Sequence, residues 1–223
     1  MIIGVVSQKG GVGKSTLTQA LAREAVAGGM TVLVADLDVQ QGSTMSWHRL
    51  RLENGITPTL DVRYFSTTAQ AIAAGEGFDI LVIDGPARAS KGTLEIAKAA
   101  DFVIQPTGAS LQDLGPGVMV FNDLTRNGKI PHARLAFALN RIGTQAEENA
   151  TREYLKQAGY QVLKGGLYER PAYRQAQNRG FSCTETRYSR LNDRADALIQ
   201  DIVDRIAKQR KRDSKVTREK AEA

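Results

Sequence analysis

The 223-residue sequence contains a single cysteine, Cys183. One thiol cannot form an internal disulfide, a four-cysteine zinc site or an internal iron–sulfur cluster, and a chain without disulfides is typical of a reducing compartment. The sequence also has no apolar run near the roughly 18 residues of a transmembrane helix. Its first residues lack the charged region and cleavage site of a signal peptide. From these absences we expect a cytoplasmic protein.

What the sequence does contain is ordinary for a globular protein, with 42% hydrophobic and 24% charged residues. A chain of this length buries roughly 70% of its unfolded surface, so it needs no disulfides to be stable. We find no linker rich in proline or serine and no internal repeat. The prediction is therefore one domain over residues 1–207.

The net charge of +6 is unevenly distributed. Residues 1–140 carry 12 basic and 12 acidic side chains, residues 141–207 carry 11 and 9, and residues 208–223 carry 7 and 3. The excess of positive charge beyond residue 140 suggests an anionic partner for the C-terminal part, and a solvated basic tail is the alternative. Because residues 208–223 contain almost no apolar side chains, we expect a disordered tail there.

Short β-branched runs predict buried strands, and helical spacing of apolar residues lies between them. The strands are expected at 1–7, 31–36, 60–65, 78–84, 102–104 and 135–139, and helices near 93–100, 110–127 and 146–158 as well as after the first strand. This alternation predicts an α/β fold with a mostly parallel, twisted sheet and helices on both faces. An apolar stripe over 191–206 predicts a final amphipathic helix packed on the domain, with a membrane-surface or partner helix as the alternative.

The strongest motif is the glycine-rich loop between the first strand and the first helix. Its glycines permit a tight turn with inward N–H groups, which together with the helix N-terminus form a cradle for phosphate. Lys14 would contact the β- and γ-phosphates, and the Ser15 hydroxyl would bind Mg²⁺. We therefore predict a P-loop NTPase with ATP and Mg²⁺ as cofactors. The expected nucleotide-binding residues of the loop are Lys9, Gly10, Gly11, Val12, Gly13, Lys14, Ser15 and Thr16.

The loop departs from the general pattern G-x-x-x-x-G-K-[ST], because Gln8 replaces the first glycine and Lys9 precedes the glycine pair. K-G-G-x-G-K-[ST]-T resembles the deviant Walker A loop of the ParA/MinD family of ATPases. The resemblance implies hydrolysis of ATP to ADP and phosphate by a homodimer closed over two nucleotides. It also implies that Lys9 reaches the nucleotide of the partner, where a second cation stabilises transition-state charge as an arginine finger does.

Acidic residues at two strand ends extend the resemblance. The segment at 34–41 resembles the D-x-D-P-Q pattern of the family, with Val39 at the usual proline position. This implies that Asp38 orients the attacking water and contacts the metal shell, and that Asp36 is a buried structural partner. Helix-capping carboxylates are the alternative. Asp84, after four apolar residues, resembles a Walker B aspartate that holds Mg²⁺ through water. The implied catalytic residues are Lys9, Lys14 and Asp38, and the implied metal residues are Ser15, Asp38 and Asp84.

Three later segments also resemble the family. Residues 106–114 match its P-T-x-x-S-x-x-D-L stretch, which lies near the dimer contact. Asn140 with Arg141 resembles its N-R pair, in which the asparagine amide reads adenine with one donor and one acceptor. A turn residue at a strand end is the alternative role for Asn140. Residues 170–180 match the pattern R-x-A-Y-x-x-A-x-x-x-G, so the resemblance covers roughly residues 1–207.

The basic residues of the C-terminal part are the candidates for nucleic-acid contacts. ParA proteins bind nonspecific DNA through C-terminal basic residues when ATP dimerises them, and phosphate contacts need only Lys and Arg at suitable spacing. An ordinary solvated face is the alternative, and Arg170 fits an intramolecular role equally well. The candidate DNA-binding residues are Arg170, Arg174, Arg179, Arg187 and Arg190.

Because the phosphate loop begins at residue 8, we expect no preceding helix-turn-helix, and in this the chain resembles the small plasmid-type ParA proteins. This implies a DNA partition ATPase that is nucleoid-associated with ATP and stimulated by a ParB-type centromere-binding protein. A membrane partner is not expected, because sixteen mostly polar residues follow the amphipathic stripe. The alternatives are a positioning ATPase acting on a membrane or protein cargo and, less favoured because of Lys9, a P-loop small-molecule kinase or ligase.

Overall fold

The computed structural model describes residues 1–86 and 90–221, and the side chains of residues 1–86 and 91–208. Seven strands of the described chain form one sheet in the order β3-β2-β4-β1-β5-β6-β7, and all of the pairings are parallel. The predicted parallel sheet is confirmed. The strands are β1 (Ile2–Val5), β2 (Val32–Asp36), β3 (Asp61–Tyr64), β4 (Ile80–Asp84), β5 (Phe102–Thr107), β6 (Leu135–Leu139) and β7 (Gln161–Val162).

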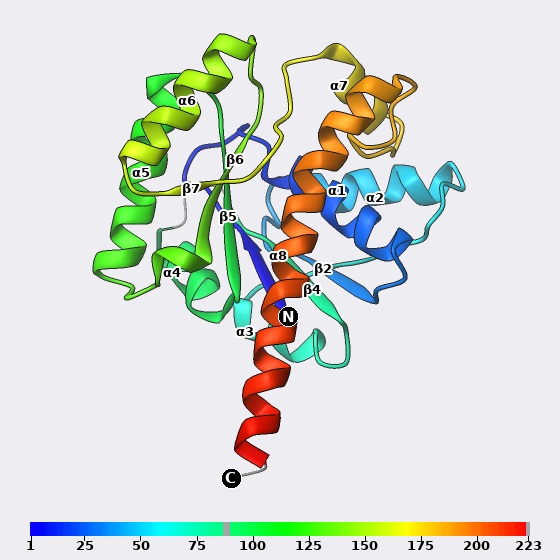
Figure 1. Ribbon diagram of the computed structural model, residues 1–223. Coiled ribbons are helices and arrows are strands. Elements are labelled where there is room, and N and C mark those ends of the chain that lie inside the picture. Colours follow the sequence, from blue (N-terminus) through cyan, green and yellow to red (C-terminus); the bar gives the residue numbers. More distant parts are fainter. Residues whose placement is uncertain (87–89, 222–223) are drawn as a thin grey trace.

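Helices cover both faces of the sheet, as Figure 1 shows. One face packs against α1, α2, α7 and α8, and the other against α3, α4, α5 and α6, each through its own hydrophobic core. The predicted three-layer α/β arrangement is therefore confirmed. The helices are α1 (Lys14–Ala27), α2 (Ser43–Glu53), α3 (Thr68–Ala74), α4 (Ser90–Ala99), α5 (Leu111–Arg126), α6 (Gln145–Gln157), α7 (Pro171–Gln177) and α8 (Ser189–Ala221), with a 3₁₀ turn η1 (His132–Arg134).

The strand order fixes where a ligand crevice forms. β1 lies between β4 and β5, and the chain builds β2, β3 and β4 on one side of β1 before β5, β6 and β7 on the other. In an open parallel sheet, the crevice lies outside the carboxyl ends of the strands at such a reversal. The register places Val5 opposite Asp84 and Asp84 opposite Asp36. Three neighbouring strands therefore end in line at the start of the glycine-rich loop.

The last helix confirms one expectation and differs from another. Ala195, Leu198, Ile202 and Ile206 are buried against the sheet, so the predicted amphipathic helix packs on the domain. Residues 208–223 were expected to be disordered, whereas α8 continues through 208–221 and projects beyond the sheet in Figure 1. Residues 208–221 contain no glycine or proline and are rich in lysine and arginine, which have high helix propensity. Among the described residues, no helix is long and apolar enough to cross a membrane.

Candidate functional site

The glycine-rich loop turns from β1 into α1 through left-handed glycines. Gly11 has φ of 74° and Gly13, the N-cap of α1, has φ of 101°. A Cβ at Gly13 would lie 1.8 Å from the Nδ2 atom of Asn140. Only glycine fits this position, because both the backbone conformation and the approach of Asn140 exclude a side chain.

Asn140 and Arg141 brace the loop from the end of β6. The Asn140 amide nitrogen donates to the Val12 carbonyl oxygen at 2.7 Å, and its oxygen accepts from the Arg141 N–H at 3.0 Å. The Arg141 guanidinium donates to the Gly11 carbonyl at 3.3 Å. Sequence reasoning did not anticipate this bracing role, which required knowing that β6 ends beside the loop. Recognition of adenine by Asn140 stays a prediction.

Asp84 lies at the floor of the site with one unsatisfied oxygen. Its Oδ2 atom accepts from the Thr44 hydroxyl at 2.7 Å, whereas its Oδ1 atom is buried and accepts no hydrogen bond from any residue that the structure describes. Burial raises the pKa of Asp84 to about 6, against the lowering effect of the Thr44 and Ser15 hydroxyls and the charge of Lys14. A buried carboxyl oxygen without a donor is well suited to face a cation or its water.

Asp36 and Asp38 divide as the sequence suggested, one inside and one at the surface. Asp36 is fully buried and accepts from the N–H groups of Met45 at 3.1 Å and Asp38 at 3.0 Å, and burial raises the pKa of Asp36. Asp38 is half-buried, and its Oδ1 atom accepts from the Gln41 N–H at 3.1 Å. Asp36 therefore ties the start of α2 to the end of β2 and leaves Asp38 facing the crevice.

These residues fit a magnesium–nucleotide complex. Asp84 offers a buried oxygen without a partner, Ser15 supplies a hydroxyl close to it, and Lys14 is 8% exposed at the start of α1. Hydroxyl, carboxylate and water oxygens are the ligands that Mg²⁺ prefers. Thr44, which holds Asp84, was missed from the sequence; its place just after the D-x-D segment was the available signal.

Two hollows lie above the loop and meet at Thr16 and Gln177. One, of about 370 Å³, is lined by Lys14, Ser15, Asp38 and Gly85 among others. The other, of about 320 Å³, includes Asn140, Arg141 and Tyr173 in its wall. Of the predicted site residues, these two hollows bring together Gly11, Gly13, Lys14, Ser15, Thr16, Asp38 and Asn140.

Lys9 does not point into these hollows. Its ammonium group forms an ion pair with Asp113, at the start of α5, and its side chain is 43% exposed. Asp113 also accepts from the Ser110 hydroxyl at 2.9 Å. The segment 106–114, predicted from the sequence to lie near a dimer contact, therefore holds Lys9 at the surface.

The structure separates the five candidate DNA-binding arginines. Arg174 forms an ion pair with Glu169, and Arg170 donates to the Glu169 carbonyl oxygen. Both line the hollow that contains Asn140. Arg190 is exposed at the start of α8.

Arg179 and Arg187 lie elsewhere, in the wall of a third hollow of about 240 Å³. Their guanidinium groups lie over the rings of Phe181 and Tyr188 at 5.6 and 5.0 Å. Neither forms an ion pair with a carboxylate of the described chain. These two arginines are therefore available to an external anion.

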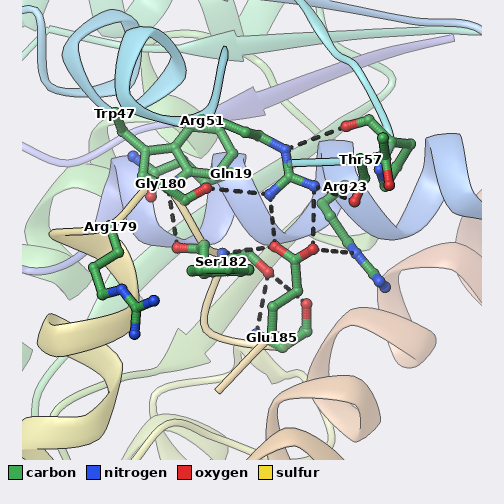
Figure 2. Close-up of polar contacts among 12 residues, drawn as sticks. Gln19, Arg23, Trp47, Arg51, Thr57, Arg179, Gly180, Ser182 and Glu185 are labelled. Carbon is green, nitrogen blue, oxygen red and sulfur yellow. Dashed lines mark hydrogen bonds and ion pairs between the residues drawn. The ribbon is translucent and has the colours of Figure 1, made fainter. Parts of the chain in front are cut away.

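A buried ion-pair cluster fixes the segment that carries these arginines. Arg51 of α2 is fully buried and contacts Glu185 through two nitrogens, at 2.7 and 3.1 Å, and also donates to the Gly180 carbonyl oxygen at 3.2 Å. Arg23 of α1 donates to the same carboxylate at 3.1 Å. Figure 2 shows Glu185 receiving these contacts while Arg179 points away from them. Residues 180–185 are thus fastened to both helices beside the phosphate loop.

The single cysteine lies in this same segment. Cys183 is 1% exposed, and burial raises the pKa of its thiol to about 12. A buried, protonated thiol is a packing group rather than a nucleophile or ligand.

Comparison with known proteins agrees with this geometry. The chromosome-partitioning ATPase Soj of Thermus thermophilus is 29% identical over 164 residues, which cover 60% of this chain and 66% of Soj, just under two thirds of that relative. The fold is that of solved ParA- and MinD-type structures. The cell division protein MinD of Aquifex aeolicus superposes with a TM-score of 0.70 at 17% identity, over 91% of this chain and 96% of that one.

A second similar structure is a Borrelia burgdorferi protein that is named for plasmid partition and is bound to AMPPNP. It gives a TM-score of 0.68 at 18% identity, over 91% of this chain and 98% of that one. Residues 3–182 match the family described as the CobQ/CobB/MinD/ParA nucleotide binding domain. The match covers most of the chain and contains the loop, the carboxylates Asp36, Asp38 and Asp84, and the Asn140–Arg141 pair. The chain belongs to the CobQ/CobB/MinD/ParA family of nucleotide-binding domains.

Proposed function

We propose that this protein is an ATP-dependent DNA partition ATPase whose ATP-bound homodimer binds nonspecific DNA. The observation that carries the nucleotide part is the convergence of the loop, Asp38 and Asp84 at the carboxyl ends of β1, β2 and β4. The T. thermophilus relative named a chromosome-partitioning ATPase supports the assignment. ATP with Mg²⁺ would supply the phosphoanhydride bond and a divalent cation for the phosphate oxygens.

The residues of this chain take distinct roles in the proposed site. The loop N–H groups and Lys14 bind the phosphates, and Ser15 and Asp84 hold the metal, Asp84 through water. Asp38 orients the attacking water, and its contact with the Gln41 N–H limits its movement. Because the low-dielectric floor contains the buried Asp36 and Asp84, a bound cation lowers the cost of keeping both ionised.

Lys9 is proposed to act on the nucleotide of a second subunit. The Lys9 side chain is 43% exposed in its ion pair with Asp113, so replacing Asp113 by another anion costs little free energy. On dimer closure Lys9 would leave Asp113 for the partner's nucleotide and add positive charge where negative charge develops in the transition state. The dimer is therefore expected only with ATP bound, because each nucleotide then presents a γ-phosphate to the Lys9 of the other subunit.

DNA binding is assigned first to Arg179 and Arg187, because they share the wall of one hollow and neither has a carboxylate partner within the described chain. A ParB-type protein would stimulate hydrolysis and release the DNA. Anisotropy of a labelled random-sequence duplex, measured with ATP, with ADP and without nucleotide at 50 to 300 mM salt, tests the proposal. We expect binding only with ATP and a log–log salt slope that reports several phosphate contacts.

The matched variants are the double substitution Arg179→Ala/Arg187→Ala and the control Arg63→Ala. Arg63 is an exposed arginine of the edge strand β3 and is paired with Asp61. The double variant should weaken binding at least tenfold and reduce the salt slope by about two, whereas the control should bind normally. Equal DNA binding with ATP, with ADP and without nucleotide would overturn the proposed dependence of DNA binding on ATP.

A positioning ATPase with a protein or membrane cargo is the second candidate. Leu111 and Met119 are 73% and 71% exposed on one face of α5, where a protein partner would bury them. Cosedimentation with anionic liposomes separates the membrane form of this candidate from DNA partition. A truncated control must end after Lys208, because Ile206 still belongs to the core.

A further inference from the structure

Gln177, at the end of α7, connects that helix to the phosphate-loop helix. Its Nε2 atom donates to the Thr16 hydroxyl oxygen at 3.0 Å and to the Gln19 side-chain oxygen at 2.8 Å. A side-chain amide nitrogen carries two hydrogens, so both donors are used on α1. Gln19 is 3% exposed, which makes its end of the contact a buried one.

Gln177 also stands where the two hollows of the candidate site meet. It lines the hollow of about 370 Å³ that contains Lys14 and Asp38, and the hollow of about 320 Å³ that contains Asn140. Thr16 is the other residue of the described chain, besides Gly11, in both walls. The Gln177–Thr16 contact is therefore part of the wall that a bound nucleotide would touch.

The direction of this hydrogen bond determines what Thr16 can do. A hydroxyl has one hydrogen to donate and two lone pairs to accept with. Because Gln177 can only donate through Nε2, it occupies a lone pair of Thr16 and leaves the hydroxyl hydrogen for an acceptor in the hollow. A phosphate oxygen is such an acceptor.

We propose that Gln177 is a positioning residue of the nucleotide site, which orients the Thr16 hydroxyl toward phosphate and couples α7 to nucleotide binding. The inference rests on the proposed nucleotide site and adds a regulatory contact to it. α7 is held at its other side by the Tyr173 hydroxyl, which donates to the Leu191 carbonyl oxygen at 2.9 Å at the start of α8. Gln177 thus links the phosphate loop to the helix that carries Arg174 and has Arg170 as its N-cap residue.

Calorimetric titration of the full chain with Mg·ADP tests this directly. Gln177→Ala should weaken binding about 3- to 10-fold, the loss expected for one oriented hydrogen bond. Gln177→Glu should be weaker still, because an ionised carboxylate accepts the Thr16 hydrogen and repels phosphate. The matched control is Gln175→Ala, an exposed glutamine of the same helix, which should change the affinity less than twofold.

A double-mutant cycle separates positioning from a merely structural role. With Thr16→Ala as background, Gln177→Ala should weaken Mg·ADP binding less than twofold, whereas with Thr16→Ser it should keep its full effect. Circular dichroism and thermal unfolding confirm that each variant is folded. Hydrogen exchange of 171–177 in wild type should slow on Mg·ADP addition, and this slowing should be lost in Gln177→Ala.

The outcomes distinguish this inference from the proposed function. Wild-type affinity in Gln177→Ala, or equal losses in the Thr16 and Thr16→Ala backgrounds, would overturn the positioning role while leaving the partition ATPase intact. Wild-type protein that binds Mg·ADP but no DNA would overturn DNA partition while leaving the role of Gln177 intact. Failure of wild-type protein to bind Mg·ADP would overturn both.

Discussion

The Thr44 hydroxyl donates to Asp84 Oδ2 at 2.7 Å, so a residue at the start of α2 holds the carboxylate at the end of β4. The contact leaves Oδ1 as the oxygen of Asp84 without a hydrogen-bond donor in the described chain. The region just after Asp38 is therefore attached directly to the proposed metal site. A movement of the Asp84 carboxylate on binding a cation would therefore also move the segment that carries Asp38.

Replacing Asp84 with asparagine should stabilise the ligand-free protein and abolish its response to Mg·ADP. Burial raises the pKa of Asp84 to about 6, so the ionised form at pH 7.5 costs the folded state about 1–3 kcal/mol that a neutral amide avoids. Thermal unfolding without and with Mg·ADP measures both effects, with the exposed Asp123→Asn as control. A destabilised Asp84→Asn protein, or one that Mg·ADP still stabilises, would contradict the assignment.

Two alanine substitutions within the loop should have opposite outcomes. Gly13→Ala places a Cβ 1.8 Å from Asn140 Nδ2 at a φ of 101°, so we expect a loss of about 2 kcal/mol or more and of nucleotide binding. Gly10→Ala meets no atom within 4 Å and should leave the melting temperature within about 2 °C. Thermal and urea unfolding measure the stability of both variants beside wild type, and titration with Mg·ADP measures nucleotide binding. Similar losses of stability in the two variants would show that neither the positive φ nor the contact with Asn140 is what requires glycine at position 13.

Lys9→Ala should spare nucleotide binding and stability but block ATP-dependent dimerisation and hydrolysis. The Lys9–Asp113 ion pair is partly exposed, so its loss should cost less than about 1 kcal/mol. Lys14→Ala, which removes the phosphate-binding cation inside the site, should instead abolish nucleotide binding. Light scattering with ATP and phosphate release compare the variants. Full ATPase activity in Lys9→Ala would contradict an action across the dimer.

Glu185→Gln should destabilise the protein in a pH-dependent manner. Burial by itself would raise the pKa of Glu185, but hydrogen bonds from Arg51 and the Ser182 N–H hold it below its ordinary value of 4.5. A depressed pKa means that this stabilisation is present above pH 4.5 and is lost as the pH falls through the folded-state pKa. At pH 7 the variant leaves the buried Arg51 charge unpaired, which costs about 3 kcal/mol.

Urea unfolding of wild type and Glu185→Gln at pH 7 and near pH 3.5 checks this prediction. The difference in unfolding free energy should narrow at low pH, because below pH 4.5 the carboxyl of the unfolded wild-type chain binds a proton and the stabilisation by the depressed pKa is progressively lost. Glu53→Gln, an exposed carboxyl of α2, serves as control. A constant difference between wild type and Glu185→Gln at both pH values would show that the ion pair is not its cause.

Local patterns predicted the sheet and the loop well, because both depend on residues adjacent in sequence. The runs ending at Asp36 and Asp84 became parallel neighbours, and the loop before Lys14 became the turn into α1. The sequence patterns did not predict the hydrogen bonds that long polar side chains form between distant parts of the chain. Nothing local to Asn140 indicated that its amide would brace Val12 across 128 residues of sequence. The prediction for the tail beyond residue 207 rested on composition, which does not distinguish a polar helix from a coil.

By itself, the sequence determined the three-layer α/β fold, the position of the phosphate loop and the placement of carboxylates at strand ends, because hydrophobic periodicity and glycine spacing act over short distances. Only the tertiary structure decided which charges are already paired. Arg51 is neutralised by Glu185 and Arg174 by Glu169, whereas Arg179 and Arg187 rest on aromatic rings without a described carboxylate partner. The sequence does not show which arginines are paired, because a partner such as Glu185 of Arg51 comes from a distant part of the chain that folding brings within hydrogen-bonding reach.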